Sequence, residues 1–226
     1  MKEMKKGRRG WKKFLLVACA LLAVALAWVG YDLYGPRRTS LREFDANEVA
    51  RLETAMWRSY YERRRVALYN QMTELLRTQY RLPLVRSNTV AYQAAQAAFV
   101  FKDGRTRTDY EKALPHLVNF YTDIRKVSDV PFDARRAAAL ELEWWIIHRQ
   151  RKNHTPAELT RALAELPAEL YQVPAERLLE HARLRAEAMT IRDNRAAAGG
   201  VTEDDWRRID ELLHASWQSL RRAVNS

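Results

Sequence analysis

Eighteen consecutive residues near the start of the chain carry no charge, and from residue 14 to residue 31 they read FLLVACALLAVALAWVGY. As an α-helix this stretch would be about 27 Å long, which is close to the shortest length that crosses the hydrocarbon core of a bilayer. We therefore predict a transmembrane anchor at residues 14–31 that contacts membrane lipid. We predict four residues spread along this stretch as residues of the membrane anchor: Phe14, Leu22, Trp28 and Tyr31.

The basic residues flanking this stretch predict its orientation. Residues 1–42 hold ten Lys and Arg against two acidic residues, whereas the rest of the chain holds 29 basic and 26 acidic side chains. Seven of the ten precede the apolar stretch, which favours a cytoplasmic N-terminus and a main domain outside the cytoplasm, in the periplasm of a Gram-negative cell. Because the main domain carries charges of mixed sign, we predict that it does not bind nucleic acid.

Two other interpretations of the apolar stretch compete with an anchor. Ala25-Leu26-Ala27 matches the small-residue site at which signal peptides are cleaved. A lipoprotein signal ending at Cys19 is not favoured, because too few apolar residues precede this cysteine and most of the apolar stretch follows it. We favour the uncleaved anchor, since the apolar stretch continues beyond Ala27. The predicted organisation is then a basic cytoplasmic tail (1–13), the anchor (14–31), a linker (32–44) containing Gly35 and Pro36, and a soluble domain (45–226).

The soluble part reads as all-α, because apolar residues recur at helical spacing and no convincing stretch alternates as a strand would. We predict a bundle of about six to seven helices. One long helix covers residues 45–80, and others cover 90–101, a stretch from 109, 133–151 and 174–194. Residues 157–170 contain Pro167 and are predicted as two short helices. Thr202 and Asp205 form a near capping box that opens the last helix, which carries a clean apolar stripe.

The first candidate site lies in the predicted helix 133–151. Glu141 is followed by Trp144 and Trp145 three and four positions later, and His148 falls near the same face. A carboxylate on such an apolar face must be paired or coordinated, because burying an isolated charge is costly. One interpretation makes Glu141 and His148 metal ligands or an acid–base pair. The other pairs Glu141 with a buried arginine from another helix and places His148 at the edge of the domain.

Two further clusters complete the set of candidate residues. His181 and Glu187 lie on one predicted helix, and Glu53 lies beside aromatic residues on the first long helix. Helical metal sites often use Glu-x-x-His spacing, which none of these candidate residues has, so ordinary salt bridges are favoured. No metal is assigned, and the candidates for metal ligation remain Glu141, His148, His181, Glu187 and Glu53.

The sequence identifies no reaction, substrate or cofactor. It contains no Gly-rich phosphate loop, no nucleophile elbow and no His-Glu-x-x-His motif. Its only cysteine, Cys19, lies in the apolar stretch, so the main domain has no disulfide. We predict a membrane-anchored structural or interaction module that binds another protein through exposed aromatic residues. The alternatives are a membrane-tethered metalloprotein or enzyme that uses buried Glu and His, and a small-molecule sensor.

Overall fold

The computed structural model describes residues 3–226, with side chains from Trp11 onward, and this part of the chain is all-α. Met1 and Lys2 of the predicted cytoplasmic tail lie outside the described residues. The elements are α1 (Glu3–Tyr34), α2 (Ala46–Tyr61), α3 (Arg65–Tyr80), α4 (Leu84–Asp103), α5 (Arg107–Glu111), α6 (Leu114–Val127), α7 (Ala134–Arg149), α8 (Pro156–Tyr171), the 3₁₀-helix η1 (Ala175–Leu178), α9 (Leu179–Ala197) and α10 (Glu203–Asn225). The predicted helical bundle following one apolar helix is confirmed.

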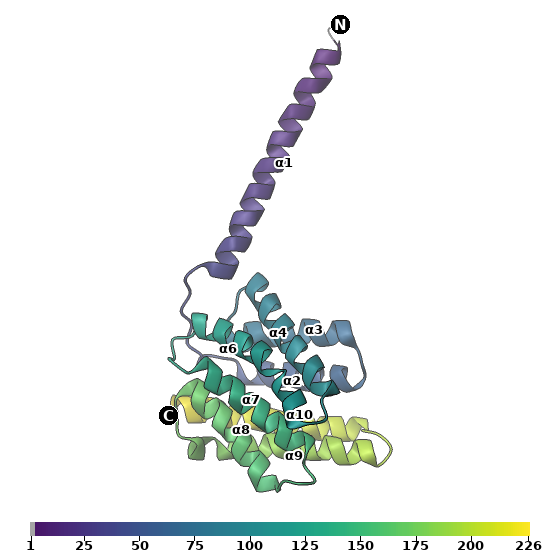
Figure 1. The fold of residues 1–226 in the computed structure, drawn as a ribbon, viewed down its shortest axis with the longest axis vertical. Helices are drawn as coiled ribbons and strands as arrows, with labels where there is room; N and C mark the ends of the chain where they lie inside the picture. The colour runs from purple at the N-terminus through teal and green to yellow at the C-terminus, as the bar shows by residue number, and fades with distance from the viewer. Residues whose placement is uncertain (1–2) are drawn as a thin grey trace.

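The first helix projects away from the rest of the molecule (Figure 1). Its segment Trp11–Tyr34 has a mean hydropathy of 2.4 and buries none of its residues against the domain. Among the residues described, it is the one helix that is long and apolar enough to cross a membrane. It continues without a break into part of the predicted tail, starting at Glu3.

A short buried junction joins α1 to the domain. Asp32 in the last turn of α1 is 5 % exposed, and its Oδ1 accepts the backbone N–H of Arg86 on α4 at 3.0 Å. The buried Arg86 side chain donates to the carbonyl oxygen of Gly35 at 3.1 Å. A Cβ at Gly35 would lie 2.4 Å from the carbonyl oxygen of Tyr31, so only glycine fits the turn that ends α1.

The predicted linker, residues 32–44, lies against the domain. Thr39 donates its backbone N–H to the carbonyl of Val127 and accepts one from Asp129, which forms a single parallel bridge. Leu41 and Phe44 are both buried in the main core. This segment therefore holds α1 and the domain in a fixed arrangement.

The helices of the domain form a closed ring. Each main helix packs on its neighbour in the chain, in the order α2, α3, α4, α6, α7, α8, α9 and α10. The last helix, α10, then packs against α2, and the two lie side by side in Figure 1. The main apolar core fills the ring, with contributions from Val49 on α2, Leu117 on α6, Leu163 on α8 and Leu220 on α10, and a smaller apolar cluster lies between α9 and α10. Side chains that point inward from distant parts of the chain therefore meet at its centre.

The predicted long helix 45–80 is wrong, because it is two antiparallel helices. The chain turns at Arg63, whose φ of 59° is left-handed, and the N–H of Arg64 bonds to the carbonyl of Ser59. The predicted helix from 109 is likewise divided, into α5 and α6. Pro115 lies in the first turn of α6, where its missing N–H costs nothing.

The prediction of two short helices over 157–170 is also wrong. Helix α8 runs unbroken from Pro156 to Tyr171 with Pro167 inside it. Leu163, Leu166 and Leu170 are buried on the same stretch, and their packing compensates for the backbone hydrogen bond that proline cannot donate. The predicted start of the last helix is confirmed, since Thr202 and Asp205 form a capping box. The whole predicted stripe of α10 is buried: Trp206, Ile209, Leu213, Trp217, Leu220 and Val224.

Candidate functional site

A buried ion pair lies at the centre of the ring. Glu53 on α2 is 1 % exposed, and its Oε1 accepts hydrogen bonds from Nη2 and Nε of Arg185 on α9, at 2.6 and 3.1 Å. Its other oxygen accepts the indole N–H of Trp217 on α10 at 2.6 Å. Both oxygens of this carboxylate are therefore satisfied, by residues from two other helices, as a buried charge requires.

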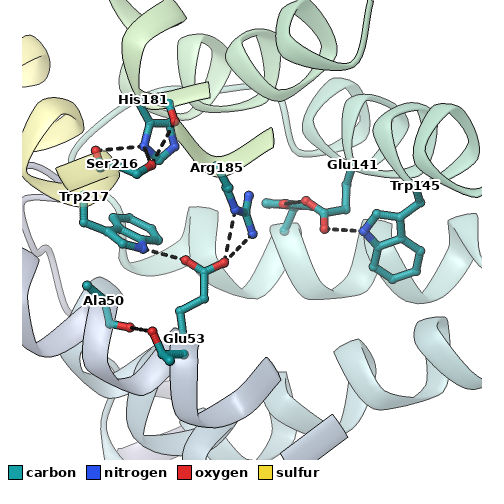
Figure 2. Close-up of polar contacts among 10 residues, drawn as sticks. Ala50, Glu53, Glu141, Trp145, His181, Arg185, Ser216 and Trp217 are labelled. Atoms are coloured by element: carbon teal, nitrogen blue, oxygen red, sulfur yellow. Dashed lines mark hydrogen bonds and ion pairs between the residues drawn. The ribbon is translucent and has the colours of Figure 1, made fainter. Parts of the chain in front are cut away.

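Glu141 of α7 lies on the other side of the same arginine (Figure 2). One of its oxygens accepts the hydroxyl of Tyr121 and the other the indole N–H of Trp145, each at 2.8 Å. Burial disfavours the charged guanidinium, but Glu53 and Glu141 together outweigh this effect and raise the pKa of Arg185. The Arg185 guanidinium also lies 5.4 Å from the ring centroid of Trp144, within the range of a cation–π contact.

Burial also holds the neighbouring tyrosines in their neutral form. It raises the pKa of Tyr80 and of Tyr121 well above the usual value, and the Glu141 carboxylate adds to both shifts. Tyr121 therefore acts as a hydrogen-bond donor to Glu141. Two hydrogen-bonded groups therefore lie side by side, one around Glu53 and one around Glu141, and the charge of Arg185 couples them electrostatically. We call Glu53, Arg185, Glu141 and their partners Trp217, Tyr121 and Trp145 the central network.

His181 lies beside the central network, one turn before Arg185 on α9. It is 3 % exposed, its Nδ1 lies 3.0 Å from the carbonyl oxygen of Ser216, and the Ser216 hydroxyl donates to the carbonyl of His181 at 2.8 Å. This reciprocal pair joins α9 to α10 (Figure 2). Burial, assisted by the positive charge of Arg185, lowers the pKa of His181 to about 4, so the imidazole is neutral at pH 7.

His148 and Glu187 each belong to a separate set of ion pairs. The Nε2 of His148 lies 3.0 Å from Oδ2 of Asp193, a carboxylate that is 5 % exposed and also contacts Arg192 and Arg151. Desolvation opposes ionisation of Asp193, but His148 and Arg192 outweigh it and lower the pKa of this carboxyl to about 2. Glu187 lies at the surface with Arg183 and Arg208, at 3.2 and 3.5 Å.

The structure thus brings together two of the five candidate residues, Glu53 and Glu141, with Arg185 between them. His148, His181 and Glu187 each bond elsewhere. Within the range that the structure describes, no group of three or more His, Cys, Asp or Glu side chains is arranged to hold a metal ion. Glu53, rather than Glu141, forms the ion pair with an arginine from another helix. Glu141 bonds to Tyr121 and Trp145 and is coupled to Arg185 electrostatically.

Sequence reasoning missed Arg185 and Asp193 as the partners of these candidates. Arg185 lies four residues after His181 and four before Met189, so the three side chains share one face of the helix. In the structure both neighbours are buried, and this face points into the core. Asp193, four residues after Met189, extends the same face.

The outer face of α4 has a different character. Residues 87–101 include no charged side chain, although 30 % of the whole chain is charged. Tyr92 and Phe99, seven residues apart and so on one side of the helix, are each 54 % exposed. On the neighbouring helix α3, Val66 is 77 % exposed and precedes Tyr69 by one turn.

Helices α3 and α4, which carry these residues, pack against each other. The Tyr69 hydroxyl donates to the carbonyl of Asn88 at 3.0 Å, which aligns α3 with α4 at this level. Val66 precedes Tyr69 by about one turn on α3, and Tyr92 follows Asn88 by about one turn on α4. We call Val66, Tyr92 and Phe99 the α3–α4 face.

No protein-family model matches this chain, and neither curated proteins nor solved structures yield a similar protein.

Proposed function

We propose that this protein is a membrane-anchored interaction module, with α1 as its anchor and the helical domain as its docking element. The observation that carries the proposal is the α3–α4 face, which exposes three large apolar side chains beside a stretch of α4, residues 87–101, that carries no charge. Exposed apolar patches of this kind mark sites of association in soluble domains.

The anchor and its orientation are part of the proposal. The length and hydropathy of Trp11–Tyr34 support a membrane span, and the excess of basic residues before it supports a cytoplasmic N-terminus. We expect the full-length chain to resist alkaline carbonate extraction and to keep its N-terminal residues. The domain should be degraded by protease added to the extracytoplasmic side. Release into the soluble fraction after cleavage at Ala27 would contradict the anchor.

Docking is tested by a photo-crosslinking amino acid at Tyr92 in cells that express the full-length protein. We expect one protein adduct of defined mass, and we expect Phe99→Lys to abolish it, because a lysine there places a charge in the apolar contact. Leu179 is a matched control position, since it is 43 % exposed and lies on α9, away from α4. Equal adducts at both positions, or an adduct unaffected by Phe99→Lys, would contradict docking at this face.

A further inference from the structure

The junction between α1 and α4 fixes how the domain faces the membrane. Asp32 and Arg86 are both 5 % exposed and joined by a hydrogen bond, and Arg86 also holds the turn at Gly35. The Thr39–Ser128 bridge and the buried Leu41 add a second attachment a few residues later. A domain attached at both places cannot swing freely about the end of α1. The side chains near this end therefore face the membrane that α1 enters.

The length of α1 places its last turn at the headgroups. The segment Trp11–Tyr34 has 24 residues. At ~1.5 Å per residue it is about 36 Å long, whereas the hydrocarbon core is about 30 Å thick. The excess leaves Tyr31 and Tyr34, which are 59 % and 84 % exposed, at the level where amphipathic aromatic rings concentrate.

The residues around this turn fit a phospholipid surface. Arg37 and Arg38 are exposed, and neither forms an ion pair with the side chains that the structure describes. Leu84, 46 % exposed, begins α4 two residues before Arg86, and α4 starts beside the end of α1 in Figure 1. The one acidic side chain on this turn, Asp32, is buried. We call Tyr31, Tyr34, Arg37, Arg38 and Leu84 the collar.

We propose that the helical domain rests on the membrane surface through the collar, with Leu84 among the lipid headgroups and Arg37 and Arg38 bound to lipid phosphates. This inference rests on the proposed function, because it requires α1 in the membrane. Guanidinium groups pair with phosphate oxygens through paired hydrogen bonds, and basic residues beside a span are attracted to anionic lipid. The α3–α4 face, which continues along α4 from Leu84, is then held at a set height above the bilayer.

The test uses the full-length chain with Cys19→Ser and a single new cysteine, in vesicles of phosphatidylcholine and phosphatidylglycerol. A fluorescent label at Leu84→Cys is compared with the same label at Leu179→Cys, which is similarly exposed but lies on α9. We expect lipids with a nitroxide at the headgroup to quench the label at position 84 several-fold more than that at position 179. Substituting Arg37→Gln and Arg38→Gln together should reduce this difference, while circular dichroism stays unchanged.

Carbonate extraction of the same vesicles separates the two possible failures. Equal quenching at positions 84 and 179 in an inserted chain would overturn the collar and leave the anchor intact. A chain that carbonate removes would overturn the anchor and the collar together. Strong quenching at position 84 that the arginine substitutions leave unchanged would overturn the binding of lipid phosphates by Arg37 and Arg38.

Discussion

At the scale of single residues, Arg185 is the one cation of the central network, between two carboxylates. It bonds to Glu53 and is electrostatically coupled to Glu141. Sequence reasoning identified both carboxylates because acidic residues on apolar faces are conspicuous. It could not identify their shared partner, because Glu53 and Arg185 lie 132 residues apart and the contact depends on closure of the whole ring.

We predict that Arg185→Met destabilises the fold more than Glu53→Gln does, because removal of the arginine leaves two carboxylates without their cation. Loss of one partner of a buried ion pair costs about 3–5 kcal/mol. The double variant should lose less than the two single variants combined, by about 0.5–3 kcal/mol. Urea unfolding in mild detergent, followed by circular dichroism, measures all three. Strict additivity would show that the two residues do not interact.

We predict that His181 makes the fold sensitive to acid. Its folded pKa of about 4 lies below the ordinary value of 6.5, so between these values the unfolded chain binds the proton and the folded chain does not. Arg185 and Glu53 are the charged groups that influence it, and Ser216 is its polar partner. Stability should therefore fall as the pH drops from about 6.5 to about 4, by at most about 3 kcal/mol.

The control for this prediction is His181→Asn, which can still donate a hydrogen bond toward the carbonyl of Ser216 but does not titrate. Its unfolding free energy should change less over the same pH range. If wild type and variant lose stability in parallel, the acid sensitivity belongs to other groups.

At the scale of helices, the sequence predicted most starts and ends that rest on local chemistry. Thr202 and Asp205 open α10 through side-chain bonds to the backbone, and such bonds involve only neighbouring residues. The sequence did not predict the turn between α2 and α3, because this turn contains arginines and none of the residues typical of turns, such as glycine, proline or asparagine. At Pro167 the sequence predicted a break that the structure does not have. Tertiary packing keeps α8 continuous through this proline, although proline usually interrupts helices.

We predict that Arg63→Gly stabilises the domain by about 0.5–1 kcal/mol, because a left-handed conformation costs a non-glycine residue about 1–2 kcal/mol, partly offset by the greater freedom of glycine when unfolded. The φ of 59° at Arg63 is the basis of this expectation. Arg63→Val should instead destabilise the domain, since a β-branched residue tolerates this conformation poorly. Thermal unfolding of both variants checks the sign of each effect.

At the scale of the whole molecule, the closed ring distinguishes this fold from an open stack of helical pairs. In an open stack each unit contacts only its neighbours, so removal of an end unit is tolerated. Here α10 contacts α9 and α2, and its Trp217 bonds to the central network. The sequence predicted an all-α bundle but not its closure, because ring closure is a contact between helices at opposite ends of the domain.

We predict that deletion of residues 202–226 unfolds the domain as a whole, since it exposes the core and leaves Glu53 without its Trp217 donor. Helical content by circular dichroism and resistance to protease should both fall sharply. Deletion of residues 1–34 is the contrasting case, because it leaves the ring complete and should preserve both properties. A stable helical remnant after removal of α10 would contradict the need for closure.

The contact between α2 and α10 also determines when, relative to its synthesis, the domain can finish folding. The helix that completes the ring is the last of its members to leave the ribosome, so no earlier portion can form the finished core during synthesis. A chain exported during synthesis therefore passes through the export channel before it has folded. Until α10 emerges, the unclosed helices expose apolar surface that chaperones recognise.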